Sequence, residues 1–201
     1  MLFSYDRLAP HYEGKIAPLE KRFLDRLRRE AIAALPSDGR MLEFGAGTGL
    51  NFHFYQPQSH GVATEPSTGM LRIAAQKQRP QGLSLIQSCA EKLPFNDGSF
   101  DSALGTLVMC SVKSPDLVFK ELQRVVKSGG TISLLEHVRP NGVLGFAFDV
   151  ANLITMPLFA DHLNRRTAEL AKKAGLKVTS VKRVGWGVIN LITCVNLKAE
   201  G

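Results

Sequence analysis

The chain has 201 residues, of which 25 are Lys or Arg and 18 are Asp or Glu, so its net charge is +7. This length suits one domain, and a hydrophobic fraction of 44% supplies a core that needs no metal or disulfide to hold it together. Cys89, Cys110 and Cys194 are widely spaced and lack a CxxC pair, which argues against a disulfide framework or a zinc site. A reducing cytoplasm is therefore the expected location.

The apolar segments favour neither secretion nor membrane insertion. Residues 1–10 lack the apolar run of a signal peptide. The most apolar stretch, residues 143–160, contains Asp149, Asn152 and Pro157, and it therefore makes a poor membrane span. The positive charge is consistent with an anionic partner, either nucleic acid or a membrane surface, or simply with solubility. We expect a cytoplasmic protein, with peripheral contact at the inner face of an anionic membrane as an open alternative.

The predicted elements begin with a helix over residues 16–35, whose apolar positions form one face and whose basic residues cover the rest. The turn at residues 36–39 ends this helix. From Arg40 onward short apolar runs alternate with helical patterns, which predicts a parallel sheet with helices on both faces. The expected strands cover residues 40–44, 61–64, 83–88, 100–109 and 131–138, and the expected helices begin near Leu50, after a Ser67 cap, and at Ser114 with Pro115.

The last third of the chain is harder to divide. Residues 139–160 predict a loop and an amphipathic helix, whose apolar side chains would face either an acceptor and membrane or the core. Residues 163–174 predict a further helix. Two closing strands, 176–184 and 188–197, are joined by a short link, so we expect them to be antiparallel neighbours.

The strongest chemical signal is the glycine-rich turn that follows the first strand. Glycines fall at 45, 47 and 49, whereas the dinucleotide fingerprint GxGxxG would place glycine at position 50, which is Leu. The spacing suits a nucleoside with an amino-acid part more than a pyrophosphate. Glu43 beside the turn would attract the cationic amino group of S-adenosylmethionine and repel a pyrophosphate. A purely structural turn is the alternative.

An acidic residue at the end of the second strand strengthens this interpretation. Glu65 lies 20 residues after Gly45, a spacing at which a carboxylate accepts hydrogen bonds from both ribose hydroxyls of a bound nucleoside. Taken alone, Glu65 would be a solvated charge at a strand end.

Three runs together resemble the class I S-adenosylmethionine-dependent methyltransferases of the ubiquinone/menaquinone-methylase type. They are residues 43–49, 65–71 and 90–101, and the similarity covers roughly residues 1–138. The resemblance implies a Rossmann-like α/β fold, with a seven-stranded, mostly parallel sheet, flanking helices and an antiparallel last strand. It implies one domain over 1–201, divided into an N-terminal helical lid at 1–39, a cofactor-binding core at 40–138, and substrate-side helices and closing strands at 139–201.

The resemblance also implies the cofactor site, with S-adenosylmethionine as cofactor, S-adenosylhomocysteine as product, and no metal. The segment matching Cys89 to Glu91 packs around the adenine in that family, although the position of Cys89 is usually Asp, and a thiol is a weak hydrogen-bonding partner. The N-terminal segment around Tyr5 and Tyr12 is a lid over the cofactor in related enzymes. The expected cofactor residues are Tyr5, Tyr12, Glu43, Gly45, Ala46, Gly47, Gly49, Asn51, Glu65, Pro66, Met70, Cys89, Ala90, Glu91, Thr106 and Leu107.

A closer resemblance concerns the methyl acceptor. Residues 106–112, 136–138 and 161–167 are similar to methyltransferase-like thiol methyltransferases and to soluble bacterial phosphatidylethanolamine N-methyltransferases. Both imply a hydrophobic or membrane-derived acceptor. We expect a phospholipid amine such as phosphatidylethanolamine, with a small hydrophobic thiol or a quinone precursor as the alternative. His137 after the fifth strand and Tyr12 are the candidate catalytic residues, and a structural role for His137 is the alternative.

Other classes of function are less well supported. No Asn-Pro-Pro-Tyr-like motif follows the fourth strand, so the sequence does not favour a nucleic-acid methyltransferase or a nucleic-acid partner. The glycine spacing disfavours an NAD-dependent oxidoreductase. A non-catalytic module that only binds the cofactor remains open. A monomer is the favoured oligomeric state.

Overall fold

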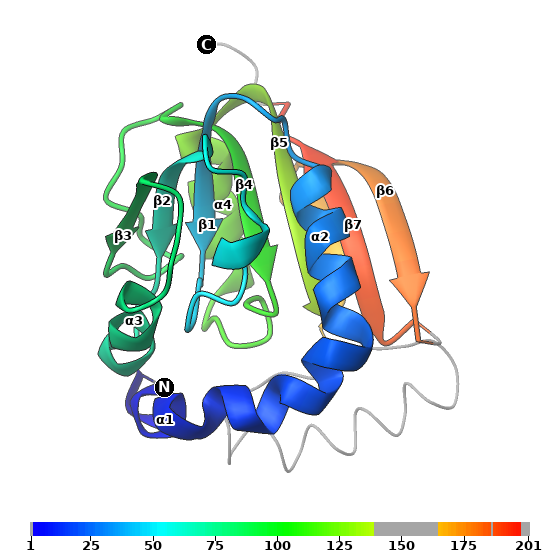
Figure 1. Ribbon diagram of the computed structural model, residues 1–201. Coiled ribbons are helices and arrows are strands. Elements are labelled where there is room, and N and C mark those ends of the chain that lie inside the picture. Colours follow the sequence, from blue (N-terminus) through cyan, green and yellow to red (C-terminus); the bar gives the residue numbers. More distant parts are fainter. Residues whose placement is uncertain (1, 139–164, 186, 198–201) are drawn as a thin grey trace.

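A computed structural model describes residues 2–138, 165–185 and 187–197 (Figure 1). Its strands form one seven-stranded sheet with the order β3-β2-β1-β4-β5-β7-β6. The pairings from β3 through β5 are parallel, whereas β7 runs antiparallel to both β5 and β6. The expected Rossmann-like sheet with an antiparallel last strand is thus confirmed. The strands are β1 (Arg40–Phe44), β2 (His60–Thr64), β3 (Gly82–Ile86), β4 (Phe100–Thr106), β5 (Val126–His137), β6 (Lys177–Val184) and β7 (Ile189–Val195).

Helices cover both faces of the sheet and one of its ends. Figure 1 shows α2 (Asp25–Ala33) in front of the sheet and α4 (Pro115–Val125) behind it. The helix α1 (Leu2–Leu19) crosses below the arrowheads of the parallel strands, next to α3 (Thr68–Ala75). A π-helical turn, η1 (Glu20–Leu24), joins α1 to α2, and α6 (Thr167–Lys173) packs beside α4. The carboxyl ends of the strands, where ligands bind in open α/β sheets, therefore face α1.

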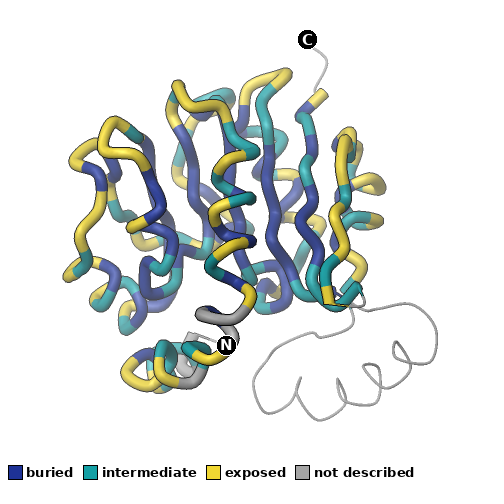
Figure 2. Tube along the Cα trace, turned by 45° about the vertical axis from the view of Figure 1, so that its right-hand side comes forward, coloured by how far each residue is buried: buried dark blue, intermediate teal, exposed yellow. Residues whose placement is uncertain are grey.

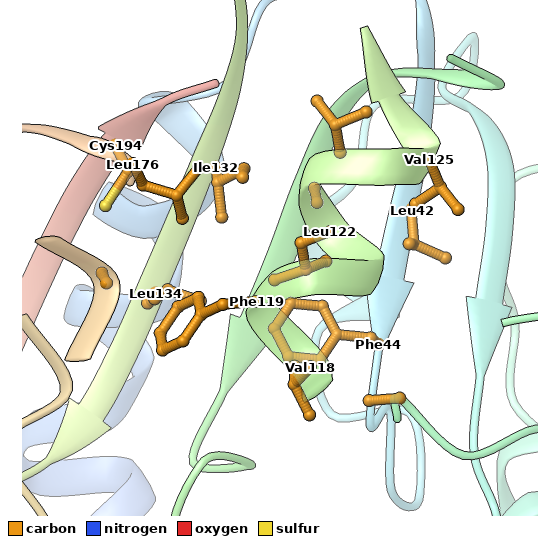
Figure 3. Close-up of a cluster of buried hydrophobic side chains, with 14 of the residues drawn as sticks. Leu42, Phe44, Val118, Phe119, Leu122, Val125, Ile132, Leu134, Leu176 and Cys194 are labelled. Carbon is orange, nitrogen blue, oxygen red and sulfur yellow. The ribbon is translucent and has the colours of Figure 1, made fainter. Parts of the chain in front are cut away.

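Apolar side chains of the sheet supply a core on each face. Successive residues of a strand point to opposite faces, and in β5 Leu134 accordingly joins one cluster while Leu135 joins the other. Figure 3 shows the first cluster, in which Phe119 and Leu122 of α4 pack against side chains on one face of the sheet. Burial of each such side chain contributes about 1.5–3 kcal/mol. Figure 2 shows that the inner strands are buried, whereas β6 at the edge is mostly exposed or half-buried.

Several boundaries differ from those predicted. The first helix begins at Leu2 rather than at residue 16, with two prolines inside it. Instead of a helix after the glycine turn there is only a 3₁₀ turn, η2 (Phe52–Phe54). The strand β5 starts at Val126, because the backbone of Gly129 and Gly130 pairs with Asn196 and so becomes part of the sheet.

Two further outcomes concern α3, α4 and the last third of the chain. The Ser67 cap is confirmed, since its hydroxyl accepts a hydrogen bond from the Met70 amide at 3.2 Å. The start of α4 at Pro115 is also as predicted. The predictions for residues 139–160 and for the beginning of the helix at 163–174 lie outside the described residues. Across the ranges that the structure describes, no helix has the length and apolarity that a membrane crossing requires.

Candidate active site

A cavity of about 430 Å³ is lined both by the loops that follow the parallel strands and by residues of α1. Its volume falls in the range of small-molecule sites, about 300–1,000 Å³. Segments from β1, β2, β3 and β4 all reach it, so the parallel sheet gathers residues that lie far apart in the sequence. Its lining residues are Tyr5, Tyr12, Arg28, Gly45, Ala46, Gly47, Thr48, Leu50, Glu65, Pro66, Ser67, Met70, Cys89, Ala90, Glu91, Thr106, Leu107, Val108, Ser111, Val112, Lys113 and Leu117.

The glycine turn forms the floor of this cavity, and its glycines have different roles. Gly45, Gly47 and Gly49 have φ angles of 67°, 58° and 78°, a region that side-chain-bearing residues rarely adopt. A Cβ on Gly45 would lie 2.2 Å from Val108 Cγ2. A Cβ on Gly47 would meet nothing within 4 Å, so the backbone there is open to a ligand. The turn is thus shaped for close approach at Gly47 and for packing at Gly45.

The carboxylate of Glu65 holds the turn from the side of β2. Its Oε2 accepts a hydrogen bond from the Gly47 amide at 2.9 Å, and its Oε1 accepts one from the Ser67 amide at 2.8 Å. Burial raises the pKa of this carboxyl, against the opposing effect of those two amides. A carboxylate has about four lone-pair positions, so Glu65 retains acceptor capacity toward the cavity that it lines.

Glu43 lies behind the glycine turn rather than in the cavity. Its Oε1 accepts a hydrogen bond from Asn51 Nδ2 at 2.7 Å, and its Oε2 accepts one from the Tyr55 hydroxyl at 2.7 Å. Burial raises the pKa of Glu43 to about 7, although these two hydrogen bonds favour the charged form. The expectation that Glu43 and Asn51 face a ligand does not match their placement, because each side chain is engaged by the other beneath the turn.

Arg28 also lines the cavity, although it is not among the site residues predicted from the sequence. Its Nη1 donates to Asn51 Oδ1 at 2.9 Å and to Thr106 Oγ1 at 2.8 Å, while its Nη2 forms an ion pair with Glu20 Oε1 at 2.7 Å. The side chain is only 4% exposed. A signal was present in the sequence, because position 28 falls within the apolar stripe formed by Leu24, Leu27 and Ala31. A cation in that stripe requires a buried partner.

The helix α1 is fastened over the cavity by polar contacts with its neighbours. The Tyr5 hydroxyl hydrogen-bonds to the Ser111 hydroxyl. Asp6 Oδ1 accepts hydrogen bonds from Ser67 Oγ at 2.6 Å and from the Gly69 amide at 2.7 Å, and these two contacts lower the pKa of Asp6. Tyr5 and Tyr12 of this helix line the cavity, and their contact with a cofactor stays a prediction.

The loop after β4, residues 107–112, forms the apolar wall of the cavity and is called the acceptor wall below. Leu107, at its start, is the one non-glycine residue with positive φ, 54°, within the described part of the chain. The side chains of Leu107, Val108, Ser111 and Val112 line the cavity. Strained backbone at such a place is typical of functional sites.

Most predicted cofactor residues line the cavity, and four predicted site residues do not. The described lining lacks Glu43, Gly49, Asn51 and His137. A Cβ on Gly49 would meet the Phe52 ring at 2.5 Å, so this glycine serves packing within its own loop. His137 follows Glu136 in β5, and since Glu136 points to the acceptor wall, His137 faces the opposite side of the sheet.

The comparisons with known proteins agree with this geometry. Residues 42–134 match the family model described as a methyltransferase domain. The chain is 30% identical over 149 residues to thiol S-methyltransferase TMT1B from Homo sapiens, which covers 68% of this chain and 61% of that protein. It is 30% identical over 164 residues to ubiquinone/menaquinone biosynthesis C-methyltransferase UbiE from Pseudomonas paraeruginosa, covering 77% and 62%. The chain thus spans about three fifths of the length of these curated relatives.

A solved methyltransferase structure is similar to this chain over nearly its whole length. An S-adenosylmethionine-dependent methyltransferase from Thermotoga maritima superposes with a TM-score of 0.72 at 26% identity, over 98% of this chain and 99% of that one. The fold, the glycine turn and the sequence matches all point to one family, whose cofactor is S-adenosylmethionine. The chain belongs to the class I S-adenosylmethionine-dependent methyltransferases.

Proposed function

We propose that this chain transfers a methyl group from S-adenosylmethionine to the sulfur of a small apolar thiol. The observation that carries the proposal is the construction of the cavity, in which a polar end at Glu65 and the glycine turn continues into the apolar acceptor wall. A cofactor and an apolar acceptor would therefore lie next to each other in a single space.

The polar end fits the parts of S-adenosylmethionine. Glu65 would accept hydrogen bonds from the ribose hydroxyls, and the open backbone at Gly47 would face the methionine part. The Arg28 guanidinium would attract the methionine carboxylate. Ala90 and Cys89 would border the adenine, with Cys89 offering a contact weaker than the family's usual Asp. Pro66 and Met70 would complete that side of the site.

The cofactor, when bound, supplies a methyl group that a positively charged sulfur makes electrophilic. The chain would contribute alignment, since holding the acceptor in line with that methyl supplies several kcal/mol. The rings of Tyr5 and Tyr12 would stabilise nearby positive charge through cation–π attraction. We propose α1 as the lid that keeps water from the reacting atoms. A thiol like that of cysteine ionises near pH 8.5, whereas an amine like that of lysine loses its proton near pH 10.4, so a thiol acceptor depends less on a base, and His137 lies outside the described lining.

The structure favours a thiol over the phospholipid amine that the sequence led us to expect. An amine is protonated near neutral pH and must lose a proton before it attacks. Of the two lining carboxylates, Glu65 is assigned above to the ribose hydroxyls, and Glu91 accepts a hydrogen bond from the Lys113 amide at 2.8 Å, so this proposal leaves neither of them as the base for an amine. Moreover, the two curated relatives above are named for a thiol and for quinone precursors, which makes a quinone precursor the second candidate.

The test is a calorimetric titration with S-adenosylhomocysteine, followed by a product assay with S-adenosylmethionine and three acceptor sets. The sets are small alkyl and aryl thiols, quinols, and phosphatidylethanolamine liposomes. We expect cofactor binding and turnover that is fastest with the thiols and rises with pH up to the thiol pKa. Turnover only with quinols or only with liposomes would replace the thiol assignment. Absence of any S-adenosylhomocysteine binding would overturn the cofactor site itself.

A further inference from the structure

Two charged side chains outside the cavity form hydrogen bonds with the backbone of the acceptor wall, one with its N–H groups and the other with its carbonyl groups. Glu136 of β5 is fully buried, and its Oε1 accepts hydrogen bonds from the amides of Val108 and Met109, each at 3.1 Å. Arg165 donates from Nη1 to the Met109 carbonyl oxygen and from Nη2 to the Val112 carbonyl oxygen at 2.6 Å. The backbone of Met109 is therefore bound by a carboxylate at its N–H and by a guanidinium at its C=O.

These contacts fix which side chains of the wall face the cavity. The Leu107 amide also donates to the Leu135 carbonyl at 2.7 Å, so the left-handed turn at Leu107 is held on both sides. The side chain of Met109 is fully buried in the core, whereas those of its neighbours Val108 and Ser111 line the cavity. A backbone conformation that costs free energy persists only where its surroundings determine it. Here the surroundings are the Leu135 carbonyl at Leu107 itself, and Glu136 and Arg165 on the residues that follow it.

We infer that Glu136 and Arg165 are positioning residues for the methyl acceptor, acting through the acceptor wall. This inference rests on the proposed function, because it assigns the acceptor to the apolar end of the same cavity. Neither side chain lines the described cavity, so neither would touch the reacting atoms. Their effect is to place the side chains of Val108 and Val112 at a fixed distance from the cofactor end. Val108 already packs against the glycine turn, where it leaves no room for a Cβ on Gly45.

The chain offers a matched control for Arg165. The side chain of the next residue, Arg166, is 51% exposed, and its described contacts are a surface ion pair with Glu169 at 3.3 Å. The variant R165M removes two charge-assisted hydrogen bonds to the wall, while R166M makes the same chemical change on the surface. R165K retains the charge and one donor position. E136Q tests the opposite side of the wall if R165M folds poorly, since it weakens the two bonds to Val108 and Met109.

Three measurements decide the inference. We expect R165M to raise the acceptor KM on the order of tenfold, with the Kd of S-adenosylhomocysteine unchanged, while R165K lies between R165M and wild type. We expect hydrogen–deuterium exchange to become faster in the peptide 107–112 of R165M and E136Q, and to stay unchanged in R166M. Equal effects of R165M and R166M, or a parallel loss of cofactor and acceptor affinity, would overturn the positioning role.

The same experiment separates failure of this inference from failure of the proposed function. If wild type binds S-adenosylhomocysteine but methylates none of the acceptors, the proposed function fails, and the exchange measurement still decides the inference. Unchanged protection of the 107–112 amides in R165M would then show that Arg165 does not hold the wall. Faster exchange confined to those amides would support the inference for an acceptor outside the tested sets.

Discussion

Replacing Glu65 with Gln separates the two tasks that this carboxylate has in the site. In the structure it accepts one hydrogen bond from the Gly47 amide at 2.9 Å and one from the Ser67 amide at 2.8 Å. A Gln side chain has a single oxygen, so it keeps one of these donors and turns its own N–H groups toward the other. A hydrogen bond to a charged group contributes about 1.5–3 kcal/mol, and we therefore expect the free energy of unfolding to fall by about 2 kcal/mol.

Cofactor affinity should fall as well, because Gln offers the ribose hydroxyls a weaker acceptor. With about 1.4–2.8 kcal/mol lost from binding, the Kd of S-adenosylhomocysteine should rise between about tenfold and 100-fold. Calorimetric titration measures that Kd, and urea unfolding measures the stability. Glu169→Gln makes the same chemical change at a side chain that is 67% exposed, and it should leave both values unchanged. A Kd for Glu65→Gln within about threefold of wild type would refute the role of Glu65 in binding.

Four further variants test the buried carboxyl, the core and the lid. Glu43→Gln should remove a pH dependence of stability: because burial raises the folded-state pKa of Glu43 to about 7, the folded state holds a proton that the unfolded state has already lost. Between about pH 4.5 and pH 7.5, wild type should therefore lose about 3 kcal/mol of unfolding free energy relative to the variant, and a pH-independent difference in urea unfolding would contradict this. Gly105→Ala would place a Cβ 2.4 Å from the Phe44 ring and should lower Tm by about 4–8 °C. Gly14→Ala, with nothing within 4 Å of its Cβ, should instead stabilise α1 by about 0.5–1 kcal/mol, and equal melting curves for these two glycine variants would be inconsistent with the packing described. Asp6→Ala should loosen α1, so that limited proteolysis cuts that helix sooner than in wild type, whereas an unchanged cleavage pattern would show that the contacts to Ser67 and Gly69 do not hold it.

The parts of the site that the sequence predicted are those encoded within a few residues. The glycine turn directly follows β1 and Glu65 directly follows β2, so the predicted strands already placed both at the carboxyl ends of neighbouring parallel strands. Glu43 lies behind the turn for a physical reason: its oxygens accept hydrogen bonds from Asn51 and Tyr55, which the 3₁₀ turn brings beneath β1, where the sequence had predicted a helix. The pattern of strands and helices in the sequence does not predict these hydrogen bonds, because they depend on the conformation of the loop after β1.

Longer-range contacts escaped prediction for the same reason. The acceptor wall is held by Glu136 and Arg165, which lie 27 and 56 positions from Met109 in the sequence. Only the pairing of β4 with β5 brings Glu136 to that loop. Arg28 is an intermediate case, because its place in the apolar stripe of α2 was visible, although the identity of its partners was not.

The strand order also dictates when the sheet can be completed during synthesis. The strand β7 lies between β5 and β6, although it follows both in the chain. Until Ile189–Val195 has left the ribosome, β6 has no strand to join, and β5 offers an unpaired edge that carries the apolar side chains of Ile132 and Leu134. Exposed edges of this kind are prone to pair with other chains. A chain released before β7 has been synthesised should therefore depend on chaperones, whereas a released chain that includes β7 should not.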